Sequence, residues 1–128
     1  MPTLLLNFYY CIDCGIYRDD GLAIIKIKGS RRIAENEINP KLRKIFKSEN
    51  LDIEIDPLTP VTNYLDVTFN LIKHVHEPYR KPKDDPVYLN ADSDHPKHVI
   101  KHIPTMIEQR LSTLSSTEGI FDTHKATY

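Results

Sequence analysis

The chain lacks a long hydrophobic run, which excludes a membrane-spanning helix. The apolar residues 4–6 and 8–10 are separated by Asn7, whereas a transmembrane span needs roughly 20 consecutive apolar residues. A secretory leader is not expected either, because the first basic residue is Arg18 and no small-residue cleavage site is present. We therefore expect an intracellular protein without a membrane partner, in a compartment that the sequence leaves unknown.

Cysteine is scarce, since the chain has only Cys11 and Cys14. Two cysteines cannot build a disulfide framework for 128 residues, so the fold must rest on its core. A zinc site that joins them to His95, His98 and His102 is not favoured. The two groups lie 81 residues apart, and structural zinc requires four convergent ligands.

Glycine is also rare, and the sequence has neither a phosphate-binding glycine loop nor a recognisable Ser/His/Asp arrangement. What is present is the composition of an ordinary soluble domain, with 40% hydrophobic and 27% charged residues. The net charge of -1 conceals an asymmetry, because residues 26–47 hold eight basic and two acidic side chains. Such a stretch could attract a phosphate backbone, although a solvated helix face is the alternative.

Residues 12–27 predict a β-hairpin. An apolar segment, 12–17, is followed by a polar triplet and then by a second apolar segment, 22–27, rich in β-branched residues. We expect Asp20 and Gly21 in the turn, because glycine readily adopts the positive φ that hairpin turns need.

Two short helices and a strand are predicted next. Ser30 is a suitable N-cap, and Pro40 is expected to break the helix or to restart it. The apolar stripe of Leu42, Ile45 and Phe46 is expected to pack against the hairpin. Apolar and acidic residues then alternate over 51–56, which predicts a half-exposed strand.

The second half of the chain is expected to start with strands and to end with helices. A strand is predicted over 61–71, and a shorter one around 87–89 is expected to pair back onto it. From His95 the apolar spacing is helical, with Pro104 between two helical segments. Residues 119–128 are expected to form the start of an element, since no later apolar stripe follows for its Ile120 and Phe121 to pack against.

Adjacent carboxylates at the hairpin are the strongest chemical signal. Asp19 and Asp20 follow Tyr17-Arg18, and oxygen ligands of this kind suit Mg²⁺. Nucleotidyl transfer uses two such ions to stabilise the attacking and leaving oxygens. A pair of aspartates in a solvated turn is the alternative interpretation.

Five spaced motifs extend this signal over nearly the whole chain. In order, they resemble the C-terminal part of reverse transcriptases from Penelope-like and related retroelements of animals. The matching segments are IYRDDGLA at 16–23, residues 46–55, NYLDVT at 63–68, PYRKP at 78–82, and the His-Pro and Ile-Pro pairs at 95–96 and 103–104.

The resemblance implies an α+β fold: a partial reverse-transcriptase palm with a β-hairpin, helices and a small antiparallel sheet, followed by a helical thumb segment. Residues 1–62 would be the partial palm with the catalytic hairpin, 63–92 primer-grip-like strands, and 93–128 the start of the thumb. The implied activity is RNA-directed DNA synthesis, with Asp19 and Asp20 as catalytic residues that hold Mg²⁺.

The resemblance also implies partners, namely an RNA template, a DNA primer and nucleotides. Lys41, Arg43 and Lys44 are then candidates to face phosphates of the nucleotide or template, and Arg80 and Lys81 to face the primer backbone.

The family's first carboxylate motif and its fingers lie upstream of the catalytic hairpin, and residues 1–11 are too few to contain them. We therefore expect an inactive fragment when the chain is alone. The alternatives are a non-catalytic nucleic-acid-binding module and a decayed element product.

Overall fold

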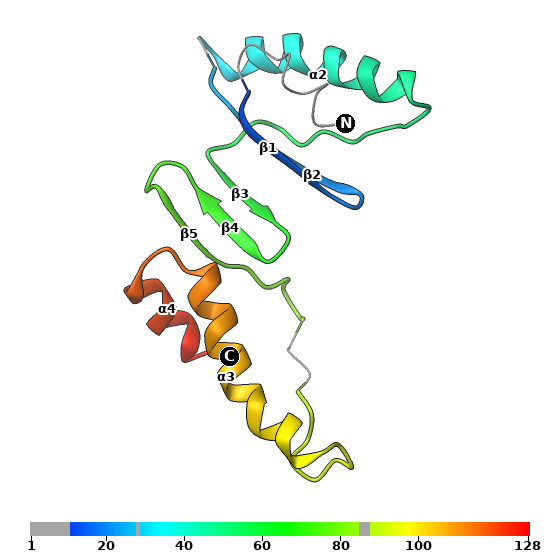
Figure 1. The fold of residues 1–128 in the computed structure, drawn as a ribbon. Coiled ribbons are helices and arrows are strands. Elements are labelled where there is room, and N and C mark those ends of the chain that lie inside the picture. Colours follow the sequence, from blue (N-terminus) through cyan, green and yellow to red (C-terminus); the bar gives the residue numbers. More distant parts are fainter. Residues whose placement is uncertain (1–10, 28, 85–87) are drawn as a thin grey trace. The chain divides into compact units, whose positions relative to one another are not determined.

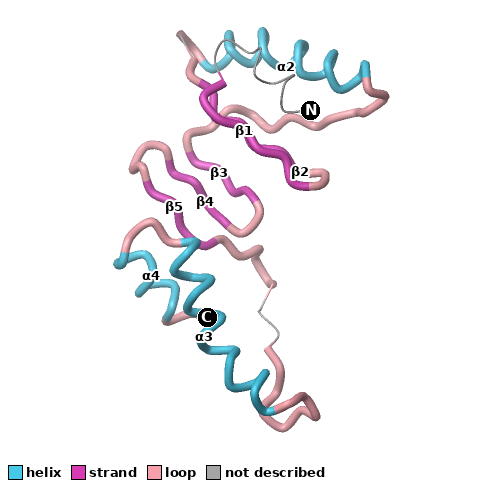
Figure 2. The backbone as a smooth tube through the Cα atoms, in the orientation of Figure 1, coloured by secondary structure: helices cyan, strands magenta, loops and turns pink. Residues whose placement is uncertain are grey.

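A computed structural model describes residues 11–27, 29–84 and 88–128 (Figures 1 and 2). The described residues form a small α+β protein with three helices and two antiparallel sheets. The α+β class predicted from the sequence is thus confirmed. The chain divides into two compact units, Met1–Thr59 and Pro60–Tyr128, which are described separately below. None of the described helices is long and apolar enough to cross a membrane.

The predicted hairpin is confirmed in the first unit. Strand β1 (Cys11–Tyr17) pairs antiparallel with β2 (Asp20–Ile25). The predicted turn position is wrong, because Arg18 adopts the positive φ of 52° and Gly21 lies within β2. Arg18 and Asp19 are the two turn residues, and a two-residue turn closes the hairpin before the glycine is reached.

A single helix follows the hairpin, so the prediction of two helices divided by Pro40 is wrong. Helix α2 (Arg31–Ser48) runs through Pro40 without interruption. The Ser30 hydroxyl accepts a hydrogen bond from the Ile33 N–H at 3.4 Å, which confirms the expected N-cap. Proline removes one backbone hydrogen bond from a helix. Ala34 and Ile38, which lie one turn apart on α2 before Pro40, are buried, and their burial offsets that loss.

Residues 51–58 run alongside α2 in an extended conformation, and the strand predicted there is wrong. They pair with no strand in the described part of the chain. The Arg43 guanidinium instead donates to the Ile53 carbonyl at 2.9 Å. The Leu58 N–H donates to the Glu35 carboxylate at 2.7 Å. The alternation of half-buried and exposed side chains therefore reflects attachment to a helix rather than sheet pairing.

The expected packing of the hairpin on α2 is not observed. Leu22 and Ile24 of β2 are half-buried, as is Leu42 of the helix stripe. Yet α2 makes no extensive contact with either strand among the described residues. Helix α2 is instead hydrogen-bonded to the segment 51–58, through Arg43 to the Ile53 carbonyl and through Glu35 to the Leu58 N–H.

The second unit begins with a three-stranded meander, β3 (Val61–Tyr64), β4 (Val67–Asn70) and β5 (Val75–Pro78). A single strand over 61–71 is therefore a wrong prediction. The chain reverses at Leu65, whose φ of 53° is left-handed and cannot continue a strand.

The third strand is β5 rather than the strand expected around 87–89. Residue 87 lies outside the described residues, and Tyr88 and Leu89 are not in a strand. Pro78 ends β5 opposite Val67 and is buried. Proline is suited to the end of a strand because it cannot donate a ladder hydrogen bond.

The expected helical tail consists of α3 (Lys97–Leu114) and α4 (Glu118–Lys125). Helix α3 is continuous through Pro104, so the expected division there is wrong. Residues 119–128 also have a partner, because α4 packs on α3 and β5. Leu111, only 1% exposed, is the most deeply buried residue described.

One ion pair joins the two helices. The Lys125 ammonium lies 2.7 Å from the Glu108 carboxylate. The hydrogen bond to Glu108 and the negative charge of that carboxylate raise the pKa of Lys125 above its ordinary value. Because the pair is exposed, its contribution to stability is small.

Candidate functional site

The tip of the hairpin presents the two candidate catalytic carboxylates. Asp19 is the second turn residue and Asp20 is the first residue of β2, paired with Tyr17 across the hairpin. All three side chains are exposed. The Arg18 guanidinium lies 5.6 Å from the centre of the Tyr17 ring, within the range of a cation–π contact. The turn therefore presents a cation next to an aromatic ring, on the same tip as the two carboxylates.

The donor set at this tip fits Mg²⁺ in part. Carboxylate oxygens are the hard ligands that this ion prefers, and Asp19 and Asp20 supply them. No group of three or more histidine, cysteine or acidic side chains suited to a metal occurs among the described residues. A complete two-ion site needs further carboxylates, which the hairpin tip does not supply.

The three basic candidates on α2 do not share one face of the helix. Lys41, Arg43 and Lys44 are all exposed. At 3.6 residues per turn, Arg43 lies about 160° around the axis from Lys41, whereas Lys41 and Lys44 are about 60° apart. Arg43 is also bonded to the Ile53 carbonyl. Only Lys41 and Lys44 thus form a pair that can face one phosphate group.

A second basic row on α2 was missed by sequence reasoning. Arg32 and Lys47 are exposed and fall within about 60° of each other around the helix axis, on the flank of Arg43. The helix has six basic side chains against two acidic ones, so both flanks are cationic. Helical spacing would have found this row if α2 had been predicted as one helix.

The primer-backbone candidates lie just after β5 in the second unit. Arg80 is half-buried, and its guanidinium lies 5.1 Å from the centre of the Tyr128 ring. Lys81 is exposed. Arg80 and Lys81 are neighbours, as predicted, but Arg80 is partly covered by a residue that the sequence did not associate with it.

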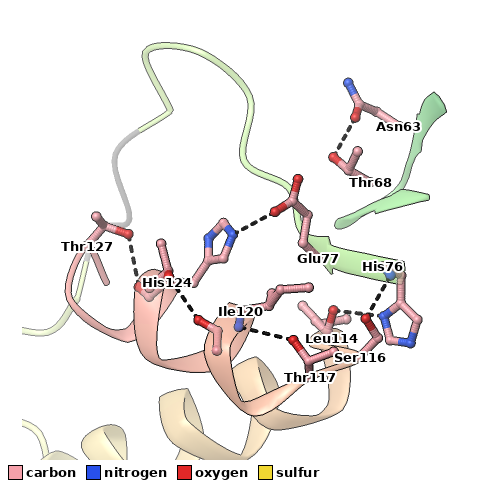
Figure 3. A network of polar contacts seen from close by, with 12 residues as sticks. Asn63, Thr68, His76, Glu77, Leu114, Ser116, Thr117, Ile120, His124 and Thr127 are labelled. Atoms are coloured by element: carbon pink, nitrogen blue, oxygen red, sulfur yellow. Dashed lines mark hydrogen bonds and ion pairs between the residues drawn. The ribbon is translucent and has the colours of Figure 1, made fainter. Parts of the chain in front are cut away.

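A polar network attaches the helices to the meander (Figure 3). The His76 N–H donates to the Ser116 hydroxyl and the Ser116 N–H donates to the His76 carbonyl, both at 3.0 Å. His76 Nδ1 lies 3.0 Å from the Leu114 carbonyl oxygen. At the next strand position, Glu77 pairs with His124 of α4 at 3.3 Å. These contacts satisfy the outer edge of β5 and indicate a structural role for this cluster.

Comparisons with protein-family models, with curated proteins and with solved structures found no match for this chain. A functional proposal for it therefore depends on its own residues and motifs.

Proposed function

We propose that this chain is the catalytic-hairpin, primer-grip and early-thumb portion of an RNA-directed DNA polymerase of the Penelope-like kind. The observation that carries the proposal is the placement of Asp19 and Asp20 at the tip of an antiparallel hairpin, directly after Tyr17-Arg18. Adjacent carboxylates at an exposed strand reversal are accessible to a metal-bound substrate.

The order of the elements supports the proposal. A hairpin, a long helix, a three-stranded meander and a helical pair follow one another along the chain. This is the succession that the motif resemblance implies for palm, primer grip and thumb. The hairpin also exposes apolar side chains, with Ile12 68% and Ile16 49% accessible. A two-stranded hairpin is marginally stable alone, so an apolar exposed face favours a larger sheet in the complete enzyme.

The chemistry assigned to the hairpin is metal binding. When bound, Mg²⁺ would supply positive charge opposite the reacting phosphate oxygens. Asp19 and Asp20 would hold it through carboxylate oxygens, together with a further carboxylate from another part of the enzyme. Lys41 and Lys44 would bind phosphates of the template or nucleotide, and Arg80 and Lys81 those of the primer.

A domain-swap experiment tests this function. Residues 12–128 replace the matching segment of an active Penelope-like reverse transcriptase, and primer extension is measured on an RNA template with Mg²⁺. We expect template-dependent synthesis that Asp19→Ala abolishes. Asp13→Ala, which removes another exposed carboxylate of the hairpin, is the control that retains synthesis. A chimera that binds primer–template but makes no DNA would refute the proposal.

A non-catalytic nucleic-acid-binding module is the second candidate function. The cationic flanks of α2 favour it, because phosphate binding requires basic side chains but no carboxylates. In that case the chimera is inactive, while the isolated chain binds nucleic acid with a strong dependence on salt.

A further inference from the structure

Two histidines lie one turn apart on α3. His98 and His102 are four residues apart within a continuous helix, and both side chains are exposed. Residues at this spacing share one face, with about 5–6 Å between their Cβ atoms. Helical histidine pairs at the same spacing chelate zinc in metalloproteases. This pair takes no part in the function proposed above.

We propose that His98 and His102 chelate one transition-metal ion, with water completing its coordination. Imidazole nitrogen suits Cu²⁺, Ni²⁺ and Zn²⁺, and the general order of affinities places Cu²⁺ first. The described residues include no third histidine, cysteine or carboxylate gathered into a metal-binding group. The site is therefore a two-ligand chelate rather than a closed structural zinc centre.

The position of the pair gives the chelate a structural consequence. Pro104 has no N–H to donate to the Ile100 carbonyl, so the helix is weakest in this turn. A metal ion that links His98 to His102 spans the residues around Ile100. It would hold this turn in the helical conformation in which both imidazoles reach the ion.

The second half of α3 is attached to the rest of its unit by other means. Arg110 pairs with Asp66, Glu108 pairs with Lys125, and the Leu114 carbonyl contacts His76. The first half, drawn in yellow in Figure 1, carries the histidine pair. Metal binding is thus expected to stabilise the helical conformation of the first half of α3 more than that of the second half.

Calorimetric titration of the untagged chain with Cu²⁺, and separately with Ni²⁺, tests the site. We expect about one ion per chain, because two helical histidines form one chelate. His98→Ala and His102→Ala should each weaken binding by about tenfold or more, since losing a ligand costs at least as much as losing an outer-shell partner. Amide hydrogen exchange of residues 99–103 should slow with metal in the parent chain and not in these variants.

Two matched variants distinguish chelation by this histidine pair from metal binding to single histidines elsewhere in the chain. His95→Ala should leave the affinity unchanged. The double variant His102→Ala/Thr105→His keeps the number of histidines, but it places the pair about 10.5 Å apart along the axis, too far for one ion. Equal binding by this variant, an equal loss in His95→Ala, or metal binding without slower exchange at 99–103 would overturn the proposal.

Discussion

At the scale of single residues, a left-handed backbone conformation at a large side chain is expected to lower the free energy of unfolding. Leu65 has a φ of 53° in the turn between β3 and β4. This conformation costs a typical L-residue about 1–2 kcal/mol, whereas asparagine adopts it more readily. Leu65→Asn should therefore raise the free energy of unfolding by about 1 kcal/mol, as measured by denaturant titration.

Leu71→Asn is the matched control for this change. Leu71 is 45% exposed and Leu65 is 44% exposed, but Leu71 does not have a positive φ. The loss of apolar area is thus similar in both variants, and only Leu65→Asn relieves backbone strain. Equal effects of the two substitutions on stability would show that the turn conformation contributes nothing.

At the scale of elements, the attachment of residues 51–58 to α2 depends on a charged hydrogen bond. The Glu35 carboxylate accepts from the Leu58 N–H at 2.7 Å in a partly buried position. Hydrogen bonds to charged groups contribute roughly 1.5–3 kcal/mol. Glu35→Ala should lower the free energy of unfolding of the first unit by about 1.5 kcal/mol, monitored by chemical denaturation.

Glu37 provides the comparison for that experiment. Its side chain is exposed on the same helix, so Glu37→Ala should change stability by no more than about 0.5 kcal/mol. Glu35→Gln keeps an acceptor oxygen and should retain part of the stability. If Glu35→Ala and Glu37→Ala behave alike, the segment 51–58 is held by its apolar contacts and not by this bond.

The elements also show what local sequence signals can predict. The hairpin and the helical tail were predicted because their apolar periodicities are local. The helices through Pro40 and Pro104 were not, because neighbouring turns and burial compensate for one missing hydrogen bond. The strand predicted over 51–56 was wrong because period-two burial arises wherever an extended chain lies on an apolar surface. That surface is formed by residues distant in the sequence.

The same limits apply to the candidate site. The adjacent aspartates and their hairpin follow from a contiguous motif, so sequence alone could place them at a strand reversal. The grouping of Lys41 with Lys44, and of Arg43 with the opposite flank, required knowing that α2 is unbroken. The contact of Arg80 with Tyr128 joins residues far apart in the sequence, and no local pattern indicates it.

At the scale of the whole molecule, the net charge of -1 coexists with a helix on which basic side chains outnumber acidic ones by six to two. Long-range attraction to a polyanion depends on such local asymmetry more than on net charge. We therefore expect the isolated chain to bind an RNA–DNA hybrid weakly and without sequence preference. The affinity should fall steeply between about 50 and 200 mM salt, as measured by fluorescence anisotropy.

Charge-matched variants identify the surface responsible for this binding. Lys41→Gln/Lys44→Gln removes two exposed charges from one flank of α2, and Lys73→Gln/Lys83→Gln removes two exposed charges from the second unit. Each phosphate-bound lysine that is lost should lower the slope of log affinity against log salt by about 1. The first variant should thus lose a slope of about 2 and the second almost none. Equal losses would assign the binding to overall charge, and undetectable binding at low salt would remove the phosphate-facing role from α2.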